Sequence, residues 1–256
     1  MVSDTDFAAV AEIAEANGDA EGQDPRYVRH LEGIGRFLIA EESGAVAGYC
    51  ATHQVGTATM LSDLFISPER QGAGVGRRLL AAAFEGAGQR FTFASQDPRA
   101  LPLYVRQGMV PRWPLLYLAG SALPAAPRGL DCRIVAPLEA AEAEFGITGQ
   151  DRKADYAFWG NGLIVRKGTA AVAAGAVGPG QLIHLVTAEH GDPVGALIAA
   201  LHVVPGGPRL EVCMPGPHPA LGELLGSGWR VADFDHHMSS SDDVLDPTSV
   251  LSPSLA

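Results

Sequence analysis

The sequence predicts an α/β (α+β) chain built of two lobes, each with a central sheet flanked by helices. Three observations lead to this fold class. Helical and strand-like segments alternate along the 256 residues, as in chains that cover a sheet with helices. A glycine-rich loop joins an apolar strand to a helix within residues 61–85. Short segments of the first half also recur about 120 positions later, which indicates a second copy of the same fold.

The composition narrows the class of protein. Hydrophobic residues make up 47% and charged residues 18%, which is ordinary for a globular chain. The net charge of −11, from 18 basic and 29 acidic residues, argues against nucleic acid or an anionic membrane as partner. There is no long apolar run and no signal-peptide pattern, and the three cysteines are scattered without metal-ligand spacing. We therefore expect a cytoplasmic protein with no metal.

The first half opens with two predicted helices. Apolar residues at helical spacing predict a helix over 5–17, which ends at Asn17-Gly18. A second, shorter helix is expected over 25–34. Strand patterns follow at 36–40, 45–54 and 57–66, and the tight turn at 41–44 makes the first two an antiparallel pair.

The stretch that follows organises the chain. An apolar run ends at Ile66, a turn follows at Ser67-Pro68, and the loop 71–76 reads QGAGVG before a helix begins. Glycines let a backbone approach a ligand, and a helix start offers unpaired N–H groups to a phosphate. The P-loop pattern is missing, which excludes a P-loop, and the missing dinucleotide fingerprint argues against a Rossmann site.

The remainder of the first half contains a strand, a helix and another strand. The strand is expected over 90–95, and Asp97-Pro98 starts a helix over 99–107 that Gly108 ends. A strand interrupted by prolines follows over 109–118. The segment 121–129 is rich in proline and small residues and is predicted to be a linker.

Two motifs in this half resemble those of the GNAT superfamily of N-acetyltransferases. Gln71, Gly74 and Gly76, placed between a strand and a helix, match the family's acetyl-CoA pyrophosphate loop. The spacing of Ala100, Tyr104 and Gly108-Met109 is similar to the family's second motif, with methionine where phenylalanine is usual. The resemblance covers roughly residues 5–120. It implies a mixed, mostly antiparallel sheet and acetyl-CoA as co-substrate.

The resemblance also implies which residues contact the cofactor. In the family the strand before the loop pairs with the pantetheine amides, and a strand N–H near Ile66 stabilises the tetrahedral oxyanion. The loop and the helix start hold the pyrophosphate. The implied cofactor contacts are Phe65, Ile66, Ser67, Gln71, Gly72, Ala73, Gly74, Val75, Gly76, Arg77, Ser95 and Tyr104.

Catalytic roles are assigned with alternatives left open. Tyr104 is the candidate acid that protonates the leaving thiolate, and its alternative role is core packing. The base that deprotonates the amine is sought among Ser62, Asp63, His53 and Asp97. Strand alternation puts Asp63 on the face opposite Ser62.

The acceptor pocket is expected to involve Tyr27 and His30 near the second helix, together with Asp97 and Trp159. Asp151, Asp155 and Trp159 would share one face of a helix and could attract a cationic acceptor. The alternative places Asp151 at a helix N-cap and Trp159 in the core.

The second copy lacks the chemistry of the first. Its loop, residues 189–195, has lost the Gln/Arg, and Pro193 deletes an N–H donor at the helix start. Asp192 would put a negative charge where a pyrophosphate should lie. The predicted organisation is a catalytic domain over 1–120, a linker over 121–129, a degenerate copy over 130–238 and an extended tail over 239–256.

The expected function is transfer of the acetyl group of acetyl-CoA to a primary amine of a small molecule, by direct attack in a ternary complex. One alternative is a transferase that uses another acyl group or a hydroxyl acceptor. The other is a non-catalytic module that senses CoA. The chain is expected to be a monomer or a homodimer.

Overall fold

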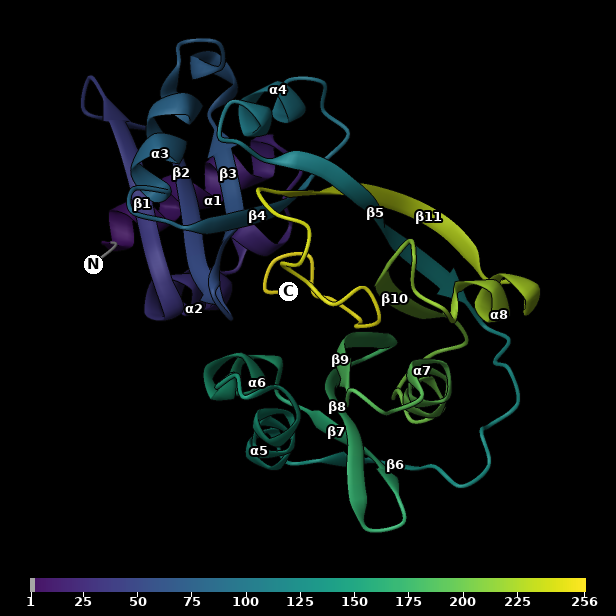
Figure 1. Cartoon of the computed structure of the whole chain (residues 1–256). Coiled ribbons are helices and arrows are strands. Elements are labelled where there is room, and N and C mark those ends of the chain that lie inside the picture. The colour runs from purple at the N-terminus through teal and green to yellow at the C-terminus, as the bar shows by residue number, and fades with distance from the viewer. Residues whose placement is uncertain (1–2) are drawn as a thin grey trace. The chain divides into compact units, whose positions relative to one another are not determined.

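The structure is a computed structural model that describes residues 3–256, apart from the side chains of residues 4 and 5. The chain divides into two compact units. The first unit comprises the chain up to Pro111 together with Met238–Val244, and the second comprises Arg112–His237 with Leu245–Ala256. Figure 1 labels the elements of both.

The first unit contains a meander of three strands, which two helices precede and two helices follow in the sequence. Helix α2 begins at the N-cap Asp24, whose side chain accepts from the Arg26 amide, and Pro25 fits the first helical position. Strands β1, β2 and β3 pair antiparallel, and β4 pairs parallel with β3. The elements are α1 Asp4–Ala16, a short 3-10 turn Glu21–Gln23, α2 Pro25–Ile34, β1 Gly35–Glu42, β2 Ala45–Val55, β3 Ala58–Ile66, a 3-10 turn Pro68–Arg70, α3 Val75–Ala83, β4 Gln89–Ala94 and α4 Ala100–Val105.

Strand β3 carries a bulge and then parts from β4. Ala51 of β2 pairs with Asp63, and the next residue of β2 pairs with Leu61, so Ser62 is an extra residue in β3. The parallel pairing of β3 with β4 runs only from Ala58–Gln89 to Leu61–Thr92. Among the described residues, β3 therefore has no β4 partner beyond the bulge, and its backbone there can pair with a ligand.

The second unit repeats this succession of elements. Its strands follow the order β11-β5-β10-β9-β8-β7-β6, with an antiparallel β6–β9 meander and a parallel β9–β10 pair. The elements are β5 Val110–Gly120, β6 Asp131–Val135, α5 Pro137–Thr148, α6 Lys153–Trp159, β7 Gly162–Lys167, β8 Ala170–Gly178, β9 Gln181–Thr187, α7 Pro193–Leu201, β10 Leu210–Pro215, α8 Leu221–Gly226 and β11 Arg230–Ser239.

The bulge is repeated as well. Ala176 pairs with His184 and the next residue of β8 pairs with Leu182, so Ile183 is the extra residue in β9. His184 in β9 thus follows its bulge as Asp63 follows the bulge in β3. This common irregularity gives the repeat a structural basis that the sequence identities alone lack.

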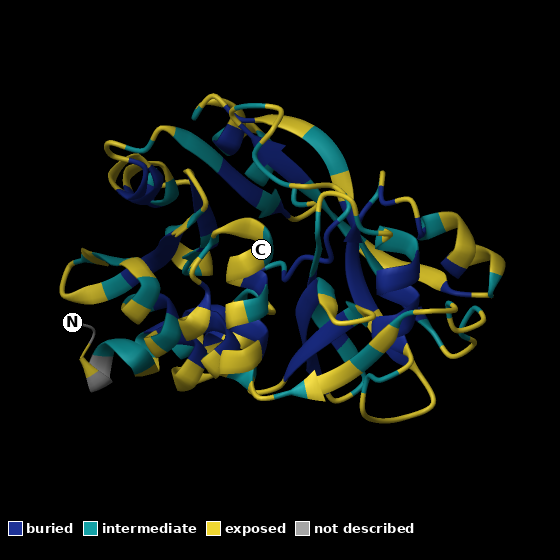
Figure 2. Ribbon diagram, turned by 60° about the horizontal axis from the view of Figure 1, so that its bottom comes forward, coloured by how far each residue is buried: buried dark blue, intermediate teal, exposed yellow. Residues whose placement is uncertain are grey.

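Each unit has an apolar core between its sheet and its helices. In the first, Leu61, Leu80 and Met109 are at most 1% exposed and pack with α3 and α4 residues. In the second, Leu163, Leu182 and other apolar side chains pack around α7, which is buried along most of its length. Figure 2 shows buried strands beneath more exposed helices and loops.

The fold class agrees with the sequence prediction of a mixed, mostly antiparallel sheet flanked by helices. The division of the chain differs from the expected boundaries, because most of β5 groups with the second unit and the end of β11 with the first. The segment 239–256, expected as an extended tail, is also partly packed, since Val250, Leu251 and Leu255 are at most 3% exposed. No helix within the described residues is long and apolar enough to cross a bilayer.

Candidate acyl-CoA site in the first unit

Gln71 holds the start of the predicted pyrophosphate loop. Its side-chain amide donates to the Ile66 carbonyl, over 3.3 Å, and to the Asn17 side chain, over 3.3 Å. Asn17 donates to the same Ile66 carbonyl over 3.1 Å. The side-chain amide oxygen of Gln71, Oε1, accepts from the Arg99 guanidinium. A single side chain therefore connects the end of β3, the end of α1 and the segment before α4.

The loop needs its glycines for backbone conformation. Gly72 and Gly74 have φ angles of 83° and 81°, in the left-handed region that glycine adopts without steric cost. Gly74 is the N-cap of α3 and offers no side chain to the helix start. The first bond into the helix runs from the Arg78 amide to the Gly74 carbonyl, over 3.2 Å.

Unpaired amides at the start of α3 follow from this geometry. Within residues 3–256, the amides of Val75, Gly76 and Arg77 donate no hydrogen bond to the backbone. Such groups, at the positive end of a helix dipole, favour an anion. Arg77 is exposed beside them, whereas the Arg78 guanidinium forms an ion pair with Glu42. The loop residues therefore fit a phosphate group.

The strand residues assigned to the cofactor continue from the bulge. Phe65, Ile66 and Ser67 are half-buried at the end of β3, where β4 no longer pairs with it. The Ser67 amide donates to the Ala47 carbonyl of β2, over 3.0 Å. The β2 side of this stretch is thus paired. On the opposite side β4 does not pair with it, and the Ile66 carbonyl accepts from the Asn17 and Gln71 side chains.

Asp63 lies in a buried polar cluster. Its Oδ1 accepts a 3.0 Å hydrogen bond from the Tyr27 hydroxyl of α2. Burial, followed by the charge of Asp19, raises the pKa of Asp63 well above its usual value. Its Oδ2 has no hydrogen-bond partner among the described residues. The preceding residue, Ser62, is the bulged residue, and its hydroxyl lies 2.9 Å from His53 Nδ1.

The remaining predicted residues of this unit lie at various depths. Tyr104 is 8% exposed and packs with the core, so its packing role is satisfied and its acid role stays a prediction. His30 is half-buried on α2, and Ser95 is exposed just after β4. Asp97 forms a charged pair with Arg99, whose hydrogen bonds hold the pKa of Asp97 below its usual value. That pairing makes Asp97 a weak base.

Comparison with known proteins shows which part of the chain resembles a known family. Residues 33–110 match the family model described as the acetyltransferase (GNAT) domain. That segment contains β1–β4, the loop and α4. The match lies within the first unit, so this segment is the part of the chain that resembles the family. No curated protein matches the chain.

Solved structures share the fold of this chain. A putative acetyltransferase from Pyrococcus horikoshii is 14% identical, with a TM-score of 0.73, and the match covers 98% of this chain and 93% of that one. A tandem GNAT protein from the clavulanic acid biosynthesis pathway is 14% identical, with a TM-score of 0.59 and coverage of 94% and 97%. A GCN5-related N-acetyltransferase from Sphaerobacter thermophilus is 16% identical, with a TM-score of 0.58 and coverage of 92% of both.

The corresponding loop of the second unit is closed to an anion. Asp192 is the N-cap of α7, and its carboxylate accepts from the Gly195 amide over 3.0 Å. Pro193 at the next position has no N–H to offer. The helix start that is free in the first unit is thus capped by an acid in the second.

Trp159, the predicted acceptor residue of the second unit, belongs to a packed network instead. Its ring stacks on His184, with centroids 5.2 Å apart, and the Arg152 guanidinium lies 5.1 Å from its centroid. Asp155 is buried and paired with Arg152 at 2.9 Å, so it is no free carboxylate for a cationic acceptor. The Asp151 side chain accepts from the Lys153 amide at the start of α6. This contact resembles the N-cap role that was the alternative for Asp151, although the N-cap residue itself is Arg152.

Sequence reasoning missed two residues of the first-unit site. Arg99 and Asn17 both bind Gln71, yet neither belongs to the two motifs. Asn17 was interpreted as a helix stop and Arg99 as the first residue of a helix. Their partners lie 54 and 28 positions away, so no local pattern could identify them.

Proposed function

We propose that the first unit transfers the acetyl group of acetyl-CoA to a primary amine of a small molecule in a ternary complex. The observation that carries the proposal is the unpaired stretch of β3, which leads directly to a loop with free amides at the start of α3. A strand edge that β4 does not pair with is followed directly by a site for an anion. This succession suits a ligand that has both amides and a pyrophosphate.

The cofactor is held by backbone groups. The amides of Val75, Gly76 and Arg77 donate to pyrophosphate oxygens, and the Arg77 side chain adds positive charge. The pantetheine amides pair with the β3 backbone at Ile66, on the side of β3 where β4 does not pair. Gln71 keeps the loop attached to the end of β3.

The reaction is a nucleophilic acyl transfer. The neutral amine nitrogen attacks the thioester carbonyl carbon, and a β3 N–H near Ile66 stabilises the oxyanion that forms. The C–S bond then breaks, and Tyr104 gives its proton to the leaving thiolate. A phenol pKa of about 10 against a thiol pKa near 8.5 makes this transfer uphill by roughly 2 kcal/mol, a small part of a reaction barrier.

The proton of the amine goes to Asp63. A carboxyl group whose pKa is raised by burial is a better base near neutral pH than an ordinary aspartate. Tyr27 fixes its orientation through the 3.0 Å hydrogen bond. The charges of Asp63 and Asp19 on this face of the sheet suit an acceptor that arrives as a cation. The Ser62–His53 pair is the second candidate for the base.

The second unit is a degenerate copy of the first. The shared order of elements, the shared bulge and the capped helix start at Asp192 support this interpretation. Its role is structural in this proposal.

The test is release of free CoA thiol from acetyl-CoA over a panel of small amines and alcohols. We expect turnover with amines, a loss of at least tenfold in kcat for Asp63→Asn, and little change for Ser62→Ala. A large loss for Ser62→Ala alone would assign the base to the Ser62–His53 pair. Binding of acetyl-CoA without turnover on any acceptor would favour a CoA sensor, and turnover on alcohols alone would favour an O-acyltransferase.

A further inference from the structure

The second unit also has a pair of strands that part after a bulge. Parallel pairing of β9 with β10 runs from Gln181–Glu211 to Leu182–Val212 and stops there. The first unit stops at the corresponding place, Leu61–Thr92. The second unit therefore retains the strand geometry that serves as a cofactor cleft in the first, an equivalence that rests on the proposed function.

A chain segment fills this opening. The Leu185 amide donates to the Val250 carbonyl over 3.1 Å, and the Val250 amide donates back to the Leu185 carbonyl over 2.9 Å. On the other side, the Leu251 amide donates to the Cys213 carbonyl of β10 over 3.2 Å. Residues 250 and 251 thus bridge the two strands where these no longer pair with each other.

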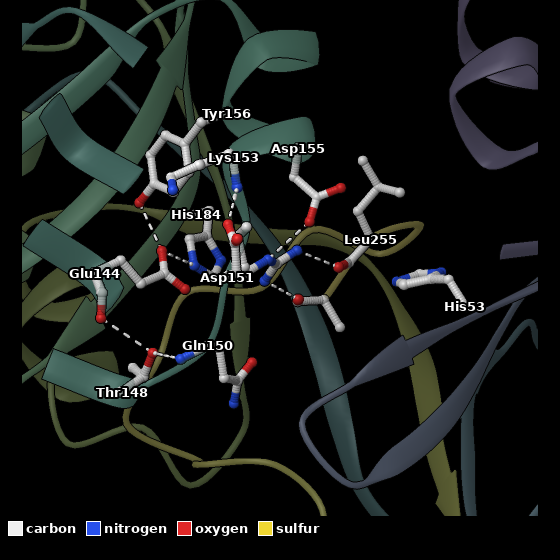
Figure 3. A network of polar contacts seen from close by, with 12 residues as sticks. His53, Glu144, Thr148, Gln150, Asp151, Lys153, Asp155, Tyr156, His184 and Leu255 are labelled. Carbon is white, nitrogen blue, oxygen red and sulfur yellow. Dashed lines mark hydrogen bonds and ion pairs between the residues drawn. The ribbon is translucent and has the colours of Figure 1, made fainter. Parts of the chain in front are cut away.

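The segment is firmly anchored. Val250 and Leu251 are 0% and 3% exposed, and Val250 packs in the apolar core of this unit. Further along, the Arg152 guanidinium donates to the backbone carbonyls of Leu255 and Ala256. Arg152 is itself fixed by Asp155, at 2.9 Å. In Figure 3 the labelled Asp155 and Leu255 are each joined by a dashed line to the Arg152 guanidinium.

A buried network lies behind this anchor. Glu144 accepts from the Tyr156 hydroxyl over 2.6 Å and lies 3.1 Å from His184 Nε2. Burial alone would raise the pKa of Glu144, but His184, Arg152 and Tyr156 outweigh burial and hold that pKa below its usual value. All three residues of the network are at most 2% exposed. These side chains therefore bond to one another in the interior of the second unit.

We propose that residues 249–256 are a built-in occupant of the cofactor-type cleft of the second unit. The segment forms the backbone hydrogen bonds that an acyl-CoA would form with β9, so the second unit is closed to acyl-CoA and one cofactor binds per chain. Acyl-CoA is excluded in a second way as well, because Asp192 caps the helix start that would hold the pyrophosphate.

Hydrogen–deuterium exchange of the full chain, with and without excess CoA, tests the proposal. Peptides that cover residues 182–187 and 245–256 are expected to exchange slowly without CoA and to remain unchanged when it is added. Fast exchange of 182–187 without CoA, or new protection there with CoA, would overturn the inference. Titration calorimetry is expected to give one CoA per chain, and a stoichiometry of two would overturn it as well.

A matched pair of variants sharpens the test. Val250→Pro removes the N–H that Leu185 accepts, whereas Val250→Ile keeps it and the apolar side chain. We expect 182–187 to exchange at least tenfold faster in Val250→Pro alone. Unchanged protection in that variant would contradict the proposal. If it does not fold, the wild-type exchange and stoichiometry decide.

The same experiment separates this inference from the proposed function. Peptide 61–67 of the first unit should gain protection when CoA is added. If it does not, the proposed function fails. Exchange of 182–187 without CoA still tests whether residues 249–256 occupy the cleft of the second unit.

Discussion

The Tyr27 hydroxyl donates a 3.0 Å hydrogen bond to Asp63, which joins α2 to the residue just after the β3 bulge. The carboxyl group is 7% exposed and its pKa is raised, first by burial and then by the charge of Asp19. Asp63 therefore keeps its proton to a higher pH than an ordinary aspartate does. It lies next to the part of β3 that is assigned to the thioester. It also makes the stability of the fold depend on pH.

Asp63→Asn should become more stable than the wild type as the pH rises. Because the folded pKa of Asp63 lies above the unfolded value of about 3.9, the folded protein binds the extra proton between those values. Wild-type stability therefore falls as the pH rises through that window, whereas the neutral amide has no such penalty. Urea unfolding from pH 4 to pH 8 measures the free energy of unfolding of both proteins. If the stability of the variant relative to the wild type fell as the pH rose, the raised pKa of Asp63 would be contradicted.

Gly74→Asp should weaken acetyl-CoA binding at least tenfold more than Gly74→Asn. Both residues incur a similar cost for the left-handed conformation at Gly74, and both can cap the helix amides. Only the aspartate adds a negative charge where the pyrophosphate is expected, as Asp192 does in the second unit. Calorimetry gives the two dissociation constants, and equal constants would argue against a phosphate at this helix start.

Tyr104→Phe should lower kcat by about a hundredfold, the usual scale for loss of a general acid. The ring remains packed in the core, so the melting temperature and the acetyl-CoA dissociation constant should hardly change. Steady-state kinetics with the best amine, alongside thermal unfolding, provides the measurement. An unchanged kcat would leave Tyr104 with its packing role alone.

Acid should destabilise the second unit through His218. Burial lowers the pKa of His218 to about 4, below the unfolded value of about 6.5. The stability of the neutral ring is present above pH 6.5 and is lost as the pH falls toward 4, by up to about 3 kcal/mol. His218→Asn should flatten this loss between pH 7 and pH 4.5. His190→Gln, at an exposed histidine, is the control and should not flatten it.

The backbone conformation of the first-unit loop was predictable because its signals are local. Gly72 and Gly74 have the positive φ angles that their residue type allows. Gly76 lies in the first turn of α3, one turn before the buried Leu79 and Leu80. The neighbours of that loop were not predictable. Arg99 and Asn17 reach Gln71 from distant segments, and nothing in their own surroundings indicates it.

The sequence by itself determined the order of helices and strands, the glycine loop and the loss of that loop in the second copy. These features depend on side-chain type and short spacings, through backbone conformation and helix capping. Only the tertiary structure decided that Ser62 bulges from β3 and that Val250 pairs with Leu185. Both depend on backbone N–H and C=O groups, which nearly every residue carries, so the sequence does not indicate which strand edge a segment will occupy.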